Sequence, residues 1–180
     1  MIGRKQGKSL NTFVDDYVVF DLETTGVSRK KDKIIEISAI KVKDRKVVDT
    51  FSTLVNPERH ISHWASDVNH IYDDMVADAP LISEVMPDFI DFIEDLPVLG
   101  HNILRFDMPF IYKECRDILD GIPNNDCIDT LPISRAKLPD MEHHGLGDLA
   151  KHFAISTEGA HRALKDCEMT QQVYEFMREI

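Results

Sequence analysis

An apolar run that ends in two carboxylates constrains the fold of this chain more than any other stretch. Residues 17–20 (YVVF) are typical of a buried strand, and Asp21 and Glu23 follow them closely. Because side chains alternate along a strand, the two carboxylates point to one side and Leu22 to the other. Adjacent carboxylates repel each other, which favours a shared proton or a divalent cation between them. For the pair alone, a strand end that reaches solvent explains the pattern slightly better.

Two further strands and a series of helices follow in the pattern of apolar residues. Residues 34–43 and 46–55 are predicted strands, joined by a hairpin with Asp44-Arg45 at its tip. Helices are predicted over residues 81–96, within 103–119 and over 131–136, 146–153 and 163–178, and short strands over 97–100 and near 127–128. An antiparallel meander followed by alternating helices and strands predicts an α/β fold with a mixed sheet in a single domain.

The domain is expected to span residues 17–180, because residues 1–16 are polar and unpatterned and indicate a flexible N-terminal leader. Polar residues interrupt any apolar core near the N-terminus, which rules out an ordinary secretory signal. No apolar stretch approaches the roughly 18 residues that a membrane helix needs. The three cysteines lack CxxC spacing and are typical of reduced thiols. We therefore expect a cytoplasmic protein with no membrane partner.

The overall charge limits how this chain could meet nucleic acid. It has 21 Lys and Arg against 32 Asp and Glu, a formal net charge of −11. This balance argues against a protein that coats nucleic acid through a basic surface. It does not exclude an enzyme that reaches a phosphate through bound metal, because the cation then supplies the positive charge. One basic patch, residues 29–33 (RKKDK), follows the opening motif, and a solvated turn is its simplest interpretation.

Two more acids lie beside apolar faces, where an ionised carboxylate costs several kcal/mol unless it is paired or coordinates metal. Asp107 borders the apolar face of a predicted helix, and Pro109 places the start of that helix close by, so a helix cap is an alternative role. Asp166 begins an apolar helical stripe. His161 precedes it by five residues, about 140° around a regular helix, so we expect His161 in the loop that leads into the helix.

The stretches that contain these residues resemble a known family. "FDLETTG", "HNILRFD" and "HRALKD" are similar to the three motifs of the DnaQ-like 3′→5′ exonucleases, in the DEDDh subgroup that includes the proofreading subunit of DNA polymerase III. The match runs in order from about residue 17 to residue 166. The resemblance implies a ribonuclease H-like fold, in which a five-stranded mixed β-sheet is flanked by α-helices.

The resemblance also implies the residues of the site. The implied metal ligands are Asp21, Glu23, Asp107 and Asp166, which would hold two Mg²⁺ or Mn²⁺ ions. Such hard cations prefer oxygen ligands, and two of them can serve the attacking and the leaving oxygen of a phosphodiester. His161 would accept the proton of the attacking water. The positions near the terminal nucleotide are Leu22, Thr24, Asn102, Phe106 and His161.

The implied activity is a 3′→5′ hydrolysis that releases nucleoside monophosphates from single-stranded or frayed 3′ ends. We expect DNA rather than RNA as the substrate, in proofreading or repair, with a DNA polymerase as a further partner. The alternatives are an RNA-trimming oligoribonuclease of the same fold and an inactive module that only binds nucleic acid. A phosphatase of the haloacid dehalogenase type is disfavoured, because its later Gly-Asp-x-x-x-Asp motif is missing. A free-standing nuclease and an excised domain of a larger protein both fit the sequence.

One stretch departs from the pattern of the family. DnaQ-like chains often have His-Gly-Ile-Thr in the loop after the third strand, and this chain has Asn69-His70-Ile71-Tyr72 there. The contacts that the Gly and the Thr make in the family are therefore not expected to transfer unchanged.

Overall fold

A mixed six-stranded sheet forms the centre of the computed structural model, which describes residues 2–180. The strands lie in the order β2-β8-β6-β3-β4-β5. They are β2 (Ser9–Leu10), β3 (Tyr17–Thr24), β4 (Ile34–Lys43), β5 (Lys46–Leu54), β6 (Val98–Gly100) and β8 (Cys127–Asp129). β3, β4 and β5 form an antiparallel meander, whereas β6 runs parallel to β3 and to β8. The predicted α/β class and the mixed sheet are confirmed.

The sheet has one strand more than the expected five, and that strand comes from the N-terminal segment. β2 pairs in parallel with β8, and the short β1 (Ile2–Gly3) pairs with β7 (Ile122–Pro123) in a separate two-stranded sheet. The Val14 N–H also donates a hydrogen bond to the Tyr174 hydroxyl at 2.9 Å. Residues 2–16 are thus part of the folded domain, which corrects the expectation of a leader over 1–16; residue 1 lies outside the described residues. Strands of two residues leave no periodicity that a pattern could reveal.

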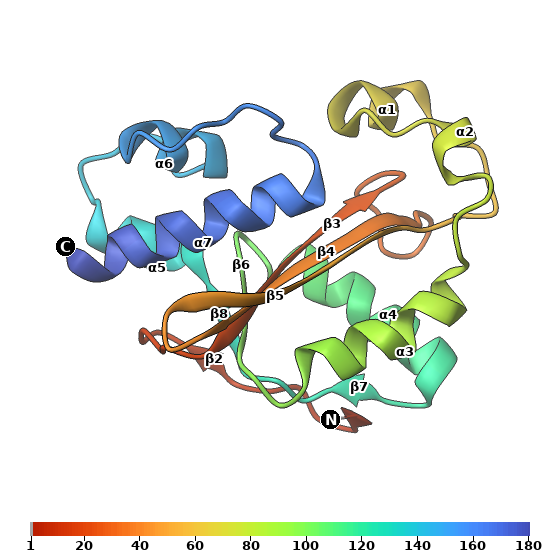
Figure 1. Ribbon diagram of the computed structural model, residues 1–180, viewed down its shortest axis with the longest axis horizontal. Coiled ribbons are helices and arrows are strands. Elements are labelled where there is room, and N and C mark those ends of the chain that lie inside the picture. The colour runs from red at the N-terminus through yellow and green to blue at the C-terminus, as the bar shows by residue number, and fades with distance from the viewer. Residues whose placement is uncertain (1) are drawn as a thin grey trace.

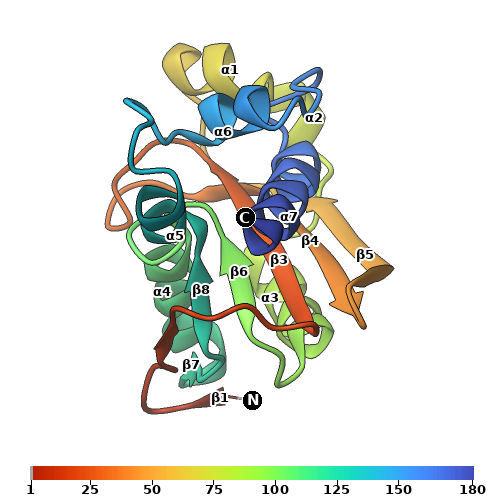
Figure 2. The ribbon, with the colours of Figure 1, turned by 90° about the vertical axis from the view of Figure 1, so that its left-hand side faces the viewer.

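Helices cover both faces of the sheet, so the molecule has three layers (Figure 1). α3 (Ile82–Ile93) and α4 (Asp107–Leu119) lie on one face, where the rings of Phe20 and Phe89 pack edge to face. α5 (Thr130–Lys137), α6 (Leu146–His152) and α7 (Ala163–Glu179) contribute to the core on the other face. Figure 2 shows α7 in front of β3. Because both faces of the sheet are covered, β3 begins with a continuous apolar run instead of an alternating one.

Two short helices in the connection between β5 and α3 were not predicted. They are α1 (His63–Asn69) and α2 (Asp73–Val76). The Ser62 hydroxyl caps α1 by accepting a hydrogen bond from the Ala65 N–H at 3.3 Å. Few residues of either helix are buried, so the apolar periodicity that reveals longer helices is weak here. The predicted helices and strands otherwise agree with the structure to within a few residues, and α4 begins at Asp107 inside the predicted range of 103–119.

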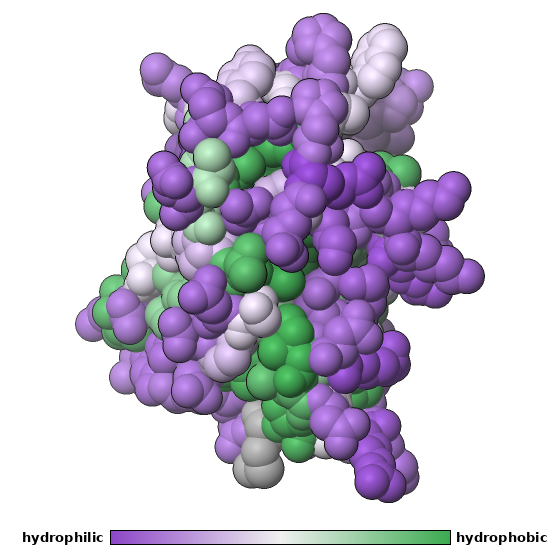
Figure 3. All heavy atoms as spheres, turned by 90° about the vertical axis from the view of Figure 1, so that its right-hand side faces the viewer, coloured by the Kyte–Doolittle hydropathy of each residue, from purple (hydrophilic) through white to green (hydrophobic). Residues whose placement is uncertain are grey.

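No helix within residues 2–180 combines the length and the apolar character needed to cross a bilayer. The side of the molecule with α1, α2 and α3 is mostly hydrophilic, and its hydrophobic side chains gather in a band over the lower half (Figure 3). Cys115, Cys127 and Cys167 are all buried and free.

Candidate active site

The carboxyl end of β3 places two acids at the edge of the sheet. Leu22 and Thr24 are buried, whereas Asp21 and Glu23 between and beside them are half-buried, in the predicted alternation. The pairing of β3 with β4 becomes irregular between Glu23 and Thr24. The strand therefore keeps its apolar side chains in the core and presents both carboxylates on one side, close to its end.

A third acid joins this pair from the opposite end of the sequence. Asp166 lies in the first turn of α7, and one carboxylate oxygen each of Asp21, Glu23 and Asp166 lies within 4.8 Å of the other two. α7 is held against the sheet by its buried stripe and by a hydrogen bond from the Cys167 thiol to the Ser38 carbonyl at 3.3 Å. The structure thus brings together three of the four predicted metal ligands, which we name the acidic cluster.

Asp107 lies beside the acidic cluster but is not one of the three. It is the first residue of α4, with Phe106 in the capping position, so Asp107 is not the helix cap. Only 3% of its surface is exposed, and its Oδ1 atom has no hydrogen-bond partner among the described residues. An unpartnered oxygen in such a place is costly, which marks it as a position for a ligand or a water.

The four acids share a site in which negative charge is disfavoured. Burial raises the pKa of Asp21 well above its usual value, and the charges of Asp107, Asp166 and Glu23 raise it further. Burial followed by the charge of Asp166 raises the pKa of Glu23 to about 8. Burial also raises the pKa of Asp107 to about 8, against backbone N–H donors that lower it. The pKa of Asp166 is raised by burial as well, so all four groups shift in the same direction.

This arrangement has the donors that a hard divalent cation needs. Within residues 2–180, no lysine or arginine forms an ion pair with any of the four acids, since Lys165 pairs with Glu168 and Arg162 with Glu36. Four clustered carboxylates that form no ion pair with a lysine or arginine among the described residues suit Mg²⁺ or Mn²⁺, and a bound cation would oppose the upward pKa shifts. The residues present therefore fit a divalent metal centre.

His161 lies in the loop before α7, as predicted. It is exposed, and its backbone has the left-handed φ of 66°. Its backbone N–H donates a long hydrogen bond of 3.4 Å to Oδ1 of Asp166. α7 begins only at Ala163, so His161 and Asp166 need not share a helical face. The backbone hydrogen bond thus keeps the exposed His161 next to the acidic cluster.

A buried ion pair that the sequence reasoning did not single out fixes the start of α7. Glu36 of β4 is 3% exposed and lies directly opposite Glu23 in the sheet. Its carboxylate accepts hydrogen bonds from the Arg162 guanidinium at 2.7 and 3.2 Å and from the Ala163 N–H at 3.1 Å. A glutamate between isoleucines in "IIEIS" was the signal that could have found it. Glu36 thereby ties the first turn of α7, and with it Asp166, to the sheet.

A second unpredicted acid organises the loop before α4. Asp129, 5% exposed, accepts hydrogen bonds from the backbone N–H groups of Asn102 at 2.9 Å and Leu131 at 3.0 Å, so it both holds the loop and caps α5. Asn102 has a left-handed φ of 60°. The neighbouring His101 shares a hydrogen bond of 2.9 Å between its Nδ1 and the Thr130 hydroxyl, and burial lowers its pKa.

The residues predicted to contact the terminal nucleotide lie in different surroundings. Leu22 is 3% exposed and belongs to the core beneath α3 and α4, so its side chain does not reach solvent. The Thr24 hydroxyl donates a hydrogen bond to the Gly26 carbonyl at 2.7 Å. Phe106 is half-buried beside Phe110. Asn102 and Phe106 are half-buried and His161 is exposed, and contacts with a nucleotide stay predictions for all five positions.

The stretch that departs from the family pattern has a structural role. Asn69 is buried, and its side-chain amide contacts the carbonyl of Thr24 at 3.4 Å and accepts a hydrogen bond from the Ile71 N–H at 3.0 Å. His70 has a left-handed φ of 57°, a conformation that glycine adopts without strain. The family's Gly at this position therefore matches a backbone requirement that His70 also meets.

Comparisons with known sequences identify what this chain is similar to. Residues 18–174 match the family model RNase T, described as an exonuclease. The chain is 42% identical over 165 residues, 92% of its length, to a DNA polymerase III PolC-type of Clostridium perfringens. It is 39% identical over 174 residues, 96% of its length, to one of Caldanaerobacter subterraneus subsp. tengcongensis. It spans only 11% and 12% of these two relatives.

Solved structures share the fold. Exonuclease X in complex with 5′-overhanging duplex DNA matches with a TM-score of 0.72 and 29% identity over 90% of both chains. The zinc-bound complex of E. coli exonuclease I with single-stranded DNA matches with a TM-score of 0.80 and 18% identity, over 97% of this chain and 41% of that chain. At that identity the second match concerns the fold alone, and together the two confirm the predicted ribonuclease H-like class.

Proposed function

Since the chain belongs to the RNase T family of exonucleases, we propose that it removes nucleotides from the 3′ end of DNA by metal-dependent hydrolysis. The observation that supports this most is the acidic cluster, in which three carboxylates lie within 4.8 Å of one another with Asp107 beside them. Family membership accounts for the type of reaction, and the cluster supplies the ligands that the reaction needs. An inactive binding module has no use for four acids kept together at this cost.

DNA is the proposed polymer because of what the relatives are. The two PolC-type proteins are DNA polymerases by name, and exonuclease X is described in complex with duplex DNA. A DNA polymerase is by the same reasoning the proposed protein partner, in proofreading or repair. Buried, free cysteines support a reducing compartment, and we place the protein in the cytoplasm.

The metal centre would use the four acids unequally. Asp21, Glu23 and Asp166 lie close enough to hold one ion, and Asp21 with Asp107 would hold a second. Two bound Mg²⁺ or Mn²⁺ ions would supply an activated water and neutralise charge on the phosphate and on the leaving oxygen. The buried Oδ1 of Asp107, which has no partner among the described residues, would accept its hydrogen bond from a water on that side.

The remaining residues orient the substrate and move the proton. His161 would accept the proton of the attacking water, because an imidazole nitrogen can act as a general base and the exposed His161 lies next to Asp166 of the acidic cluster. Asn102, in the loop before α4, and Phe106, directly before its first residue, would contact the terminal nucleotide. Leu22 and Thr24 would support that position from beneath, through the packing and the backbone of β3.

A time course on labelled oligonucleotides tests this function. Single-stranded DNA, RNA of the same sequence and a duplex with a mismatched 3′ end, each labelled at the 5′ end, are incubated with Mg²⁺ or Mn²⁺. We expect DNA ladders that shorten from the 3′ end, none in EDTA, and none with Asp21→Asn. His161→Ala should lower the rate strongly while metal binding persists. Ladders from RNA but not from DNA would favour the oligoribonuclease instead, and activity that survives Asp21→Asn would refute the mechanism.

A further inference from the structure

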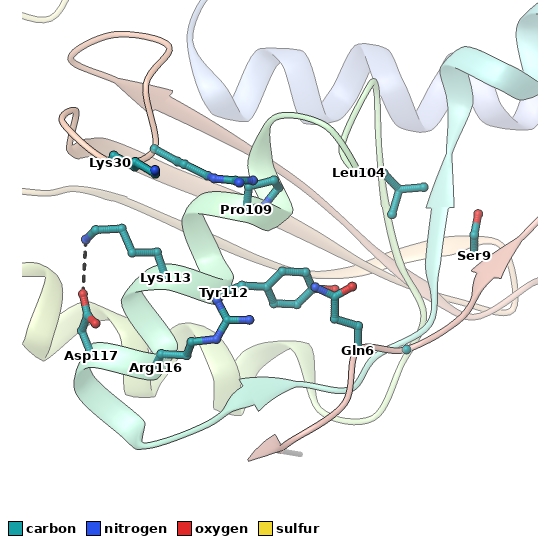
Figure 4. A pocket seen from close by; sticks show the side chains of 11 residues that line it. Gln6, Ser9, Lys30, Leu104, Pro109, Tyr112, Lys113, Arg116 and Asp117 are labelled. Atoms are coloured by element: carbon teal, nitrogen blue, oxygen red, sulfur yellow. Dashed lines mark ion pairs between the residues drawn. The ribbon is translucent and has the colours of Figure 1, made fainter.

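A basic cavity lies on the outer side of α4, apart from the four acids. It has a volume of about 670 Å³ and is bounded by the loop after β3, by α4 and by the N-terminal segment. Figure 4 shows Lys30 of the loop and Lys113 and Arg116 of α4 around the same opening, with Gln6 at its other side. Three segments that are distant in the sequence therefore form one hollow.

The charge of this cavity is opposite to the charge of the chain. Four of its lining residues are cations, Arg29, Lys30, Lys113 and Arg116, against the single acid Asp117, whereas the chain as a whole has a net charge of −11. Lys113 is partly neutralised by Glu114 at 2.6 Å and Asp117 at 3.4 Å. The other three cations are exposed, and none of them forms an ion pair within the described part of the chain. The lining of the cavity therefore has a net positive charge.

The loop that bears two of these cations is held in a fixed shape. The Thr25 N–H donates to the Lys33 carbonyl at 2.8 Å, and the Arg59 guanidinium donates to the Lys31 carbonyl at 2.7 Å. Asp32, the only acid of the RKKDK stretch, accepts a hydrogen bond from the Ser28 N–H at 2.8 Å. Because Asp32 forms its hydrogen bond within the loop, it does not pair with Arg29 or Lys30, and both cations are exposed.

The position of the cavity relates it to the acidic cluster. Both of its basic walls begin next to the site: the loop follows Glu23 and Thr24 directly, and Leu104 and Pro109 of the lining flank Asp107 in the sequence. Lys113 and Arg116 come six and nine residues after Asp107 on α4. At a rise of about 1.5 Å per residue they lie about 9 and 14 Å farther along the helix axis.

We propose that this cavity binds the sugar–phosphate backbone of the strand whose 3′ end lies at the acidic cluster. The proposal rests on the proposed function. Arginine binds phosphate through paired hydrogen bonds, and cations paired with phosphates release counterions from the nucleic acid. A strand advances about 3.4 Å per nucleotide in a duplex, so Lys113 and Arg116 would meet phosphates about three to four nucleotides from the end. The basic stretch after β3 thereby acquires a role beyond that of a solvated turn.

Salt dependence of binding tests the proposal. Binding of a fluorescent single-stranded 20-nucleotide DNA is measured in EDTA over a range of salt concentrations, for the wild type and for Lys30→Ala/Arg116→Ala. Loss of two phosphate contacts should make the slope of log K against log salt shallower by about 1.4 and weaken binding at low salt. The matched control is Lys43→Ala/Lys46→Ala, which removes two charges from the hairpin at the opposite end of the sheet and should keep the wild-type slope.

The outcomes separate this proposal from the proposed function. Equal slopes for the wild type and the cavity variant overturn the proposal, as does an equal change in the control variant. If the cavity variant loses affinity only for a duplex with a recessed 3′ end, the cavity binds the complementary strand, and this result also overturns the proposal. Hydrolysis of the p-nitrophenyl ester of thymidine 5′-monophosphate, which is too short to reach the cavity, tests the catalytic site separately. A wild type that cleaves neither ester nor DNA refutes the proposed function, while the slopes still decide on the cavity.

Discussion

At the scale of single residues, the four acids of the site oppose folding, and their proposed function is to bind metal. Each has a pKa that is raised by burial, and the pKa of Asp21 rises further because Asp107, Asp166 and Glu23 surround it. The folded chain without metal therefore holds repelling charges that the unfolded chain would separate. Binding a divalent cation removes this repulsion, which couples metal affinity to stability.

Neutralising the central acid should stabilise the protein without metal. In EDTA at about pH 8.5, Asp21→Asn replaces a buried acid whose ionisation opposes folding with a neutral amide, and we expect a melting temperature at least ~2 °C higher than that of the wild type. Saturating Mg²⁺ should raise the melting temperature of the wild type and not that of the variant. Thermal denaturation followed by circular dichroism measures both. A variant that melts below the wild type in EDTA would show that Asp21 is held by favourable contacts.

His101 should make stability depend on pH in a definite direction. Burial lowers its pKa, so below about pH 6.5 the unfolded chain takes up a proton here that the folded chain refuses. The free energy of unfolding should then fall between about pH 7 and pH 5. His101→Gln should reduce this fall in urea denaturation, whereas His143→Gln, at a position whose side chain is 73% exposed, should leave it unchanged. Identical pH profiles for the wild type and His101→Gln would contradict the assignment.

At the scale of elements, the site depends on how three of them end. β3 ends with Asp21 and Glu23, α4 starts with Asp107, and α7 starts just before Asp166. The Glu36–Arg162 pair connects the first turn of α7 to β4. The position of α7 relative to the sheet therefore sets where Asp166 lies in the acidic cluster.

Breaking this connection should cost both stability and rate. Glu36→Gln keeps the shape of the side chain but removes its charge and weakens its bonds to Arg162 and Ala163, and we expect a loss of about 1–3 kcal/mol in the free energy of unfolding. The rate of hydrolysis should fall because Asp166 is less well placed. Glu168→Gln, which disrupts an exposed pair on the same helix, should cost less than about 1 kcal/mol. Equal losses in the two variants would argue against a special role for Glu36.

The sequence allowed the long elements and the chemistry to be predicted, because both depend on local patterns. Apolar periodicity placed β3, β4, α3 and α7, and acids beside apolar faces led to Asp107 and Asp166. Glu36 and Asp129 were not predicted as site residues, because their partners lie far away in the chain or are backbone groups that no side-chain pattern shows. Leu22 lies in the core, since a strand covered on both faces buries alternate residues on each of them, and its position near the terminal nucleotide stays a prediction.

At the scale of the whole molecule, charge is distributed unevenly. An acidic chain gathers four acids at one end of the sheet and three cations without ion pairs among the described residues beside α4. Bound metal would make the acidic cluster attractive to phosphate, so both regions would then favour a polyanion. This explains how a chain with a net charge of −11 could bind a polyanion.

The N-terminal segment should contribute to the stability of the whole fold. Deleting residues 1–12 removes the pairing of β2 with β8 and the packing of Leu10, and we expect the free energy of unfolding to fall by about 2 kcal/mol or more. Urea denaturation of the full chain and of the shortened chain measures the difference. An unchanged midpoint would restore the picture of a flexible leader.

Counting bound metal ions tests the central claim most directly. Mn²⁺ is titrated into the protein in the presence of thymidine 5′-monophosphate, and free Mn²⁺ is followed by its electron paramagnetic resonance signal. The acidic cluster and Asp107 predict two bound ions per chain, one in Asp107→Asn and a large loss of affinity in Asp21→Asn. Binding that is absent from the wild type, or unaffected by Asp21→Asn, would contradict the assignment of these carboxylates as the metal centre.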